Sequence, residues 1–340
     1  MIYKPSLSYG DVLLVPKYSD IVSRKEVDIS SALDCWRGLE LPIISSPMDT
    51  ITESSMANAM ANEGGLGIIH RYNSIEMQAQ QAYQVSDHDR KAAAIGITGD
   101  YLERAQALYD VGVRILCLDV AHGHHILMKK AITSLKALYS DVHIMAGNVA
   151  TKKGFEDLAS WGADSIRCNI GGGSICSTRV QTGHGVPGLQ TIFDCFQADV
   201  DRDVKIIADG GIRNSGDIVK ALAAGADFVM IGSLLAGTKE TPGEVLYSSS
   251  GTARKIYRGM ASKEAQHNWR GSHSSNEGIS TTVPLKGSAS EILTDLENGI
   301  RSGLSYSGAR SIMELQVNAE FIVQTQSGQT ESGTHILLRN

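Results

Sequence analysis

Residues 204–233, VKIIADGGIRNSGDIVKALAAGADFVMIGS, combine two apolar runs with a helical segment between them. The runs VKIIAD (204–209) and FVMIGS (228–233) are short, continuous and rich in Ile and Val, as is typical of strands buried on both faces. The segment SGDIVKALAA (215–224) has apolar residues at helical spacing and is followed by Gly225, a residue type that often ends helices. The stretch therefore predicts a strand, a crossover helix and a parallel strand.

Runs of this kind occur eight times along the chain. They are LPIISS (41–46), LGIIH (66–70), AAAIGI (92–97), RILCLD (114–119), VHIMAG (142–147), SIRCNI (165–170), VKIIAD (204–209) and FVMIGS (228–233). Helical patterns lie between them, for example at 100–111 and at 152–161, where Gly162 follows. Eight alternations of strand and helix predict an α/β fold, the (β/α)8 barrel, with a doubly wound open sheet as the alternative.

The chain of 340 residues is 42% hydrophobic, which is enough for a large core. We expect residues 1–340 to form a single catalytic barrel domain. Residues 238–287 interrupt the pattern, because they are polar and rich in Gly and Ser before a last helix near 289–302. A connection of this length predicts an active-site flap or insertion.

Composition excludes several classes of protein. The formal charge of −6 gives no basic surface for nucleic acid, and no apolar run reaches the length of a membrane span. The five cysteines are odd in number, widely spaced and without a CxxC pair, which argues against a disulfide framework and a zinc site. The first residues do not read as a secretory signal, so we expect a cytoplasmic protein.

Polar residues follow the ends of the later predicted strands. Asp119 ends the fourth strand, Asn148 follows the fifth, Asp209 ends the seventh and Ser233 ends the eighth. In a parallel barrel all of these positions meet on one rim, where active sites are built.

Glycines after the seventh and eighth strands indicate a phosphate site. Amides of Gly211, Gly232 and Ser233, with a short helix expected to begin near Ser233, would hold a phosphate. Asp209 would then reach ribose hydroxyls. A flavin mononucleotide and a purine nucleotide both fit these features.

The loop GGGSICSTR (171–179), after the sixth strand, places Cys176 among glycines and small hydroxyl residues. A core cysteine normally has bulky apolar neighbours, whereas a nucleophilic thiolate needs access and nearby positive charge. Arg179 supplies a positive charge close in sequence. Because this loop leaves the same rim as the phosphate site, we interpret Cys176 as a nucleophile.

Together with several other stretches of the chain, the cysteine loop and the phosphate motif resemble the IMP dehydrogenase and GMP reductase family. The matching stretches are LSYGDVLLVP (7–16), SSPMDTITES (45–54), GNVAT (147–151), GADSIRCNIGGGSICSTRVQTGHG (162–185), IIADGGIRNSGDIVKALAAGADFVMIGSLLAG (206–237), YRGM (257–260) and GIRSGLSYSGA (299–309). They extend over nearly the whole chain, and the cysteine-loop and phosphate motifs occur in the family's order and spacing.

The resemblance implies that Cys176 attacks C2 of a purine nucleotide and that a nicotinamide cofactor exchanges hydride with C2. Thr178 and Glu277 match the residues that move the proton of the leaving group or water. The substrate contacts implied are Ser174, Asp209, Gly211, Gly232, Ser233, Tyr257, Gly259 and Met260. Asp119 and Asn148 match positions near the nicotinamide. The carbonyls of Gly171, Gly173 and Cys176 match a monovalent-cation site, commonly for potassium, and the family forms homotetramers.

Two absences favour the reductase of this family. The 16 residues between Met260 and Glu277 contain no Arg-Tyr pair, which the dehydrogenases use to activate water. Residues 74–96 run through without the CBS pair that dehydrogenases usually carry. We therefore predict a GMP reductase that uses NADPH to convert GMP to IMP and ammonia.

The alternative is an IMP dehydrogenase that converts IMP, NAD and water to XMP, favoured by AHGH (121–124) and by Arg270 acting as the base alone. A flavin-dependent or non-catalytic nucleotide-binding barrel is a third interpretation. The histidines near the rim are interpreted as loop residues close to the cofactor rather than as metal ligands; they are His122, His124, His125 and His184.

Overall fold

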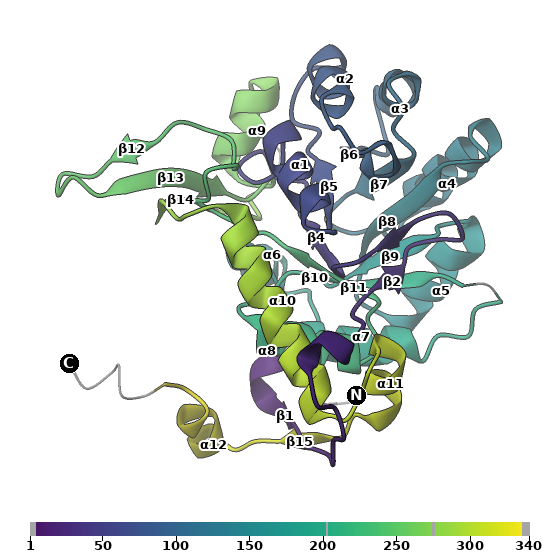
Figure 1. Cartoon of the computed structure of the whole chain (residues 1–340). Helices are drawn as coiled ribbons and strands as arrows, with labels where there is room; N and C mark the ends of the chain where they lie inside the picture. Colours follow the sequence, from purple (N-terminus) through teal and green to yellow (C-terminus); the bar gives the residue numbers. More distant parts are fainter. Residues whose placement is uncertain (1–4, 202, 274–275, 335–340) are drawn as a thin grey trace.

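The computed structural model of the chain describes residues 5–201, 203–273 and 276–334. Eight parallel strands form a closed barrel, as predicted (Figure 1). They are β4 (Ile43–Ser45), β5 (Leu66–Ile69), β6 (Ala92–Ile95), β7 (Ile115–Asp119), β8 (His143–Val149), β9 (Ser165–Cys168), β10 (Lys205–Asp209) and β11 (Phe228–Ile231). Because β4 pairs with both β5 and β11, the sheet has no edge, and the open-sheet alternative is wrong.

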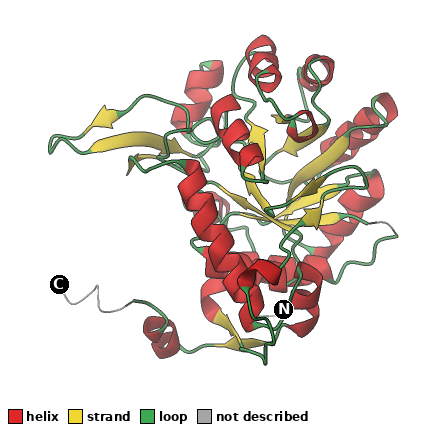
Figure 2. Ribbon diagram, viewed as in Figure 1, coloured by secondary structure: helices red, strands yellow, loops and turns green. Residues whose placement is uncertain are grey.

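Helices surround the barrel on the outside (Figure 2). They are α1 (Ser54–Asn62), α2 (Ile75–Tyr83), α3 (Tyr101–Asp110), α4 (Ile126–Leu138), α5 (Lys152–Trp161), α6 (Thr178–Thr182), α7 (Gly188–Phe196), α8 (Ser215–Ala223) and α10 (Ala289–Tyr306). The local sequence explains their ends. Thr151 caps the start of α5 by accepting from the amide of Gly154, and Gly162 ends α5 with a φ of 113°.

Side chains alternate between the barrel interior and the helix layer. In β6, Ala92 and Ala94 point into the interior cluster, whereas Ala93 and Ile95 pack toward the helices. The hairpin of β2 (Ser31–Ala32) and β3 (Gly38–Leu39) adds apolar side chains to the interior cluster. The inside of the barrel is therefore largely a packed apolar core. Polar groups gather toward the carboxyl ends of the strands, and at the amino ends His143 and Ser165 form a buried hydrogen-bonded pair.

Smaller elements lie outside the barrel. β1 (Val12–Leu14) pairs antiparallel with β15 (Phe321–Val323), which joins the two ends of the described chain. The remaining elements there are the 3-10 turns η1 (Tyr9–Asp11), η2 (Arg24–Glu26) and η3 (His88–Arg90) and the helices α11 (Ile312–Asn318) and α12 (Gln326–Glu331).

The polar segment 238–287 is more regular than its sequence predicts. It contains β12 (Leu246–Tyr247), β13 (Ala253–Arg258), α9 (Lys263–Arg270) and β14 (Ser280–Pro284), and the three strands form an antiparallel sheet. Figure 1 shows this sheet extending to one side of the barrel, with α9 above it. Lys255 of β13 is buried and donates to the carbonyls of Lys239 and Thr241, which anchors the sheet to the turns after β11.

Two local predictions at the rim need correction. Asn148 lies within β8, which continues to Val149, rather than after the strand. Ser233 lies two residues beyond β11, and hydrogen-bonded turns follow it in place of the expected short helix. Within the described residues, none of the helices is both long and apolar enough to cross a bilayer.

Candidate active site

A cavity of about 510 Å³ opens at the carboxyl ends of the strands. Every residue predicted for the site lines it. These residues are Asp119, Asn148, Gly171, Gly173, Ser174, Cys176, Thr178, Asp209, Gly211, Gly232, Ser233, Tyr257, Gly259, Met260 and Glu277. They come from the carboxyl ends of five different strands, from the loops after them and from segment 238–287, so only closure of the barrel brings them together.

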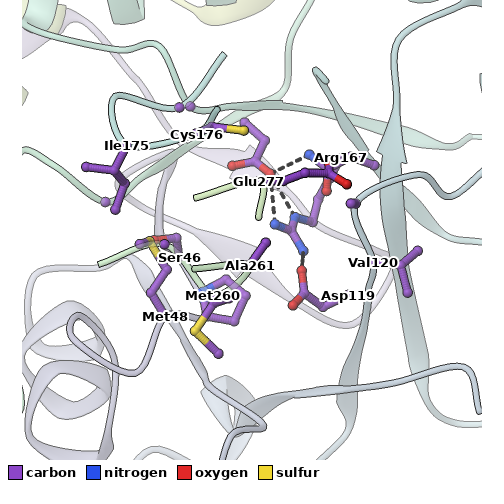
Figure 3. Close-up of a pocket in the computed structure, with 18 of the residues that line it drawn as sticks. Ser46, Met48, Asp119, Val120, Arg167, Ile175, Cys176, Met260, Ala261 and Glu277 are labelled. Atoms are coloured by element: carbon purple, nitrogen blue, oxygen red, sulfur yellow. Dashed lines mark hydrogen bonds and ion pairs between the residues drawn. The ribbon is translucent and has the colours of Figure 1, made fainter. Parts of the chain in front are cut away.

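The thiol of Cys176 begins a chain of hydrogen bonds. Its Sγ donates to Oγ1 of Thr178 over 3.1 Å, and the Thr178 hydroxyl donates to Oε2 of Glu277 over 2.8 Å. Figure 3 shows Cys176 and Glu277 next to each other on one wall of the cavity. A thiol connected through a hydroxyl to a carboxylate can lose a proton to that chain, or send one to a leaving group.

Backbone pairing holds Glu277 beside the cysteine loop. The amide of Ser177 donates to the carbonyl of Glu277, and the amide of Ile279 donates to the carbonyl of Ile175. Cys176 and Gly278 form an isolated antiparallel bridge between these contacts. The cysteine loop and the end of segment 238–287 therefore form one continuous wall of the cavity.

The opposite part of the cavity has the features of a phosphate site. Gly210 and Gly211 adopt positive φ values of 78° and 77°, which non-glycine residues rarely adopt. A Cβ on Gly232 would lie 2.8 Å from Oγ of Ser46, so Ser46 would have to shift to admit a larger residue at this turn. The backbone here can thus approach an anion closely.

Hydroxyl groups complete this end of the cavity. Ser174 and Tyr257 lie within hydrogen-bonding distance, 3.3 Å apart, and burial raises the pKa of the Tyr257 phenol. The Ser46 hydroxyl is buried without a hydrogen-bond partner although Ser46 lines the cavity. Lys286 donates to the carbonyls of Ser233 and Leu234 and so supports the turn from behind. The sequence analysis did not identify Ser46 or Lys286.

Arg167 is a central site residue that the sequence analysis also missed. It points from β9 into the barrel and is nearly completely buried. Its guanidinium binds Oδ1 of Asp119 over 2.6 Å, as Figure 3 shows. It also binds Oδ2 of Asp209 over 2.8 Å. One buried cation thus neutralises the carboxylates predicted for the cofactor and for the ribose. The sequence feature that could have identified Arg167 was a single charged residue inside the apolar run SIRCNI (165–170).

Asn148 supports the same network. Its side-chain amide donates to Oδ2 of Asp209 over 2.7 Å and to the carbonyl of Asn169 over 3.0 Å. Because Arg167 and Asn148 both donate to Asp209, this carboxylate is held in one orientation at the floor of the cavity.

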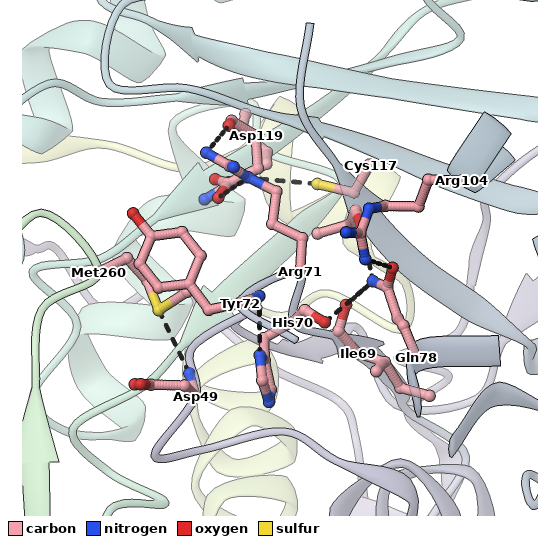
Figure 4. Close-up of polar contacts among 12 residues, drawn as sticks. Asp49, Ile69, His70, Arg71, Tyr72, Gln78, Arg104, Cys117, Asp119 and Met260 are labelled. Carbon is pink, nitrogen blue, oxygen red and sulfur yellow. Dashed lines mark hydrogen bonds and ion pairs between the residues drawn. The ribbon is translucent and has the colours of Figure 1, made fainter. Parts of the chain in front are cut away.

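A second missed group lies at the mouth of the cavity. Arg71 and Tyr72 follow β5 one residue after its end, and both line the cavity with Trp269 of α9. Figure 4 shows Arg71 extending toward Asp119, and its guanidinium donates to the Asp119 carbonyl over 3.2 Å. Arg71 and Tyr72 come directly after the predicted strand 66–70, as other site residues come after theirs. This position in the sequence could have identified them.

The rim histidines do not line the cavity. His124 pairs with Asp157 over 2.8 Å, and His125 caps α4. His122 lies near the other three, and burial with their charges lowers its pKa. Among the described residues, no three or more His, Cys, Asp or Glu side chains are grouped so that they could hold a metal ion.

With this geometry in view, comparisons with known proteins identify the family. Residues 6–335 match the IMP dehydrogenase / GMP reductase domain. The chain belongs to this family. Its members are oxidoreductases of purine metabolism that use a nicotinamide cofactor, so this chain is an oxidoreductase.

Individual members of the IMP dehydrogenase and GMP reductase family are similar over nearly their full lengths. An IMP dehydrogenase of Borreliella burgdorferi is 38% identical over 98% of both chains. A GMP reductase of Leishmania major is 32% identical, covering 97% of this chain and 96% of the relative. A solved structure of a cysteine-to-alanine variant of GMP reductase from Trypanosoma brucei, in complex with guanosine 5'-monophosphate, has a TM-score of 0.93 and 30% identity over 98% of each chain.

The lengths of these alignments weaken one argument from the sequence. The alignment with the Leishmania GMP reductase extends over 475 residues, as does that with an IMP dehydrogenase of Nitrosopumilus maritimus. The alignment with the Borreliella IMP dehydrogenase extends over only 399 residues. Alignments far longer than this chain of 340 residues occur with a dehydrogenase and with a reductase, and a shorter alignment occurs with another dehydrogenase. The lack of an insertion in this chain therefore does not distinguish the two activities.

Proposed function

We propose that the protein is a GMP reductase, which converts GMP and NADPH to IMP, ammonia and NADP through a covalent intermediate on Cys176. The observation that carries the proposal is what the segment between Met260 and Glu277 contributes to the cavity and what it lacks. It contributes α9 and Trp269 to the cavity wall, and it contains no Arg-Tyr pair to activate water. The proton chain from Cys176 to Glu277 is nevertheless complete.

The proton chain suits loss of ammonia. Sγ of Cys176 bonds to C2 of GMP, and the exocyclic amino group leaves C2 as ammonia after taking up a proton. Thr178 is placed to deliver this proton, with Glu277 behind it as the source. Bound NADPH would supply a hydride to C2. The bond between C2 and Sγ then breaks, which returns the thiolate and releases IMP.

The rest of the cavity suits a nucleoside monophosphate. The phosphate would lie on the amides of Gly211, Gly232 and Ser233, with the hydroxyls of Ser174 and Tyr257 beside them. The ribose would bind the carboxylate of Asp209. The base would then lie toward Gly259 and Met260, close to Cys176, and Met260 is held there by the amide of Asp49, which donates to its Sδ over 3.3 Å.

The nicotinamide would lie toward Asp119 and Asn148, because both residues line the cavity and match the family's positions near this group. The network around Arg167 connects this cofactor side to the ribose side. Family membership favours nicotinamide chemistry over the flavin-dependent alternative. The choice of NADPH over NADH follows from the proposed reductase activity.

The second candidate is an IMP dehydrogenase, since many of the similar proteins carry that name. It requires a base for water, and Arg270 was the candidate in the sequence. In the structure the Arg270 guanidinium donates to Oε1 of Gln266 and to the carbonyl of Ser272. Both hydrogen bonds use the guanidinium as a donor, whereas a base for water must accept a proton.

A monovalent cation, commonly potassium, is proposed at the carbonyls of Gly171, Gly173 and Cys176. Backbone carbonyl oxygens in an irregular loop are suitable ligands for a hard cation. Gly173 already accepts from the amide of Cys176 over 3.1 Å, so cation binding would have to share that oxygen. Activity in potassium and lithium chloride at equal ionic strength tests this site. A homotetramer in the cytoplasm is proposed with it, and sedimentation velocity tests the assembly.

Paired assays test the proposed function. With GMP and NADPH we expect loss of absorbance at 340 nm and release of one ammonia for each NADPH consumed. With IMP and NAD we expect no XMP. Formation of XMP from IMP and NAD, with no reaction in the first assay, would establish the dehydrogenase instead.

A further inference from the structure

Helix α9 forms one side of the cavity roof. Gln266, Trp269 and Arg270 on its inner face all line the cavity. The start of the helix is fixed, because Ser262 caps it by accepting from the amide of Ala265. The side chain of Gln266 is buried and donates to the carbonyl of Ala261, next to Met260. The helix therefore extends from the base pocket with little freedom at its first turn.

The other end of α9 is held by an aromatic contact. The ring of Trp269 stacks on Tyr72, with centroids 4.2 Å apart and planes inclined by 11°. The guanidinium of Arg71 lies 5.3 Å from the Tyr72 ring and 5.5 Å from the Trp269 ring, within the range of cation–π attraction. The contact joins segment 238–287 to the end of β5 across the cavity mouth.

The contact between Trp269 and Tyr72 matters because of the reactivity of the covalent intermediate. Its C2 atom is electrophilic toward water as well as toward hydride. If water reached C2, its oxygen would bond there, the bond between C2 and Sγ would break, and a water proton would go to the thiolate. The product would be XMP, with no oxidant or reductant consumed. A reductase must therefore keep water away from C2 until the hydride arrives.

Resting on the proposed reductase function, we propose that Trp269 is a specificity-determining residue. Its indole, stacked on Tyr72 and Arg71, closes the roof and excludes water from C2 of the covalent intermediate. The intermediate then reacts with hydride rather than with water.

Arg71 and Tyr72, which lie against the Trp269 indole, are not arranged to take a proton from water. Arg71 and Tyr72 form an Arg-Tyr pair in sequence, but the Arg71 side chain is engaged in an ion pair with the carboxylate of Asp119, 3.7 Å away. Burial raises the pKa of the Tyr72 phenol, which keeps it protonated. The stack therefore excludes water, and the pair beneath it does not activate water.

Product analysis of three variants tests the role of Trp269. Trp269→Ala removes the stack, Trp269→Phe keeps an aromatic ring, and Trp36→Ala is a matched control at a tryptophan that is 84% exposed. With GMP and NADPH, we expect Trp269→Ala to raise the ratio of XMP to IMP by about tenfold or more, equivalent to about 1.4 kcal/mol in relative barriers. Trp269→Phe should recover most of the parent ratio, and oxygen-18 from labelled water should appear in the XMP.

A second measurement does not depend on turnover. The rate at which iodoacetamide alkylates Cys176 is compared with that of Cys35, an exposed cysteine on the same chain. Trp269→Ala should raise the relative rate for Cys176, whereas Trp36→Ala should not.

The outcomes separate the inference from the proposed function. If the parent makes IMP and ammonia, and Trp269→Ala gives no extra XMP and no faster alkylation, the inference is overturned and the reductase function stands. A higher KM for NADPH without XMP would make Trp269 a cofactor contact instead. If the parent itself makes XMP from IMP and NAD, water already reaches C2, and both proposals fail.

Discussion

Thr178 and Glu277 are 99 positions apart in the sequence, yet the Thr178 hydroxyl donates a 2.8 Å hydrogen bond to the Glu277 carboxylate. The same hydroxyl accepts from the thiol of Cys176. Because a hydroxyl can donate and accept at once, Thr178 connects the proposed nucleophile to the Glu277 carboxylate. This connection is the basis of the first prediction.

Replacing Glu277 with Gln should leave the hydrogen bond to Thr178 in place but remove the group that exchanges a proton. We expect kcat for GMP to fall by about 10²-fold or more, as for loss of a general acid or base, with little change in KM. Steady-state kinetics with GMP and NADPH measure this. Glu103→Gln, at an exposed position of α3, is the control. Equal activity of the two variants would remove Glu277 from the proton chain.

Replacing Cys176 with Ala should abolish turnover, by at least about 10³-fold, because loss of a covalent nucleophile removes the reaction path itself. GMP binding should be largely retained, since the phosphate turn and Asp209 are untouched. Calorimetric titration with GMP and the ammonia assay measure the two properties. Cys35→Ala, at an exposed cysteine, should keep both. Substantial remaining turnover in Cys176→Ala would refute the covalent role.

Replacing Asp209 with Asn should weaken the binding of GMP. A hydrogen bond to a charged group is worth about 1.5–3 kcal/mol, which corresponds to roughly a 10- to 100-fold rise in the dissociation constant. The loss should be smaller for 2'-deoxyguanosine 5'-monophosphate, which has one ribose hydroxyl fewer. Titrations with both nucleotides test this, with Asp295→Asn on the exposed side of α10 as control. Equal losses for the two nucleotides would place the 2'-hydroxyl elsewhere.

Asp227, just before β11, predicts a specific dependence of stability on pH. Its carboxylate accepts from the amide of Ile206 over 2.8 Å, but burial raises its pKa to about 6. A raised pKa means that the folded state prefers the neutral acid, so this stabilisation is complete below the unfolded pKa and is lost as the pH rises through 6. Asp227 should thus lower the free energy of unfolding by about 1 kcal/mol between pH 5 and pH 8.

Asp227→Asn tests this, because an amide does not titrate and its oxygen can still accept from Ile206. Urea unfolding of parent and variant at several pH values gives the difference in free energy. We expect the variant to gain stability relative to the parent as the pH rises, and Asp295→Asn to show no such trend. Parallel curves for parent and Asp227→Asn would contradict the prediction.

Much of the fold follows from local sequence. The eight apolar runs predict the eight barrel strands because strands buried on both faces need continuous apolar residues. Residues such as Asp119, Gly211 and Cys176 could be placed on the rim because the carboxyl ends of parallel strands share one side of the barrel. The strands of segment 238–287 were missed. β14, for example, is mostly exposed and so has no apolar period to reveal it.

The sequence by itself thus determined the barrel and predicted its polar rim and a candidate nucleophile, since each depends on short-range periodicity or on the chemistry of one loop. Only the tertiary structure decided that Arg167 neutralises Asp119 and Asp209, and that Trp269 closes on Tyr72. These contacts join residues from separate strands and loops, and they form only when the closed barrel brings those segments to one end. No local pattern in the chain encodes that proximity.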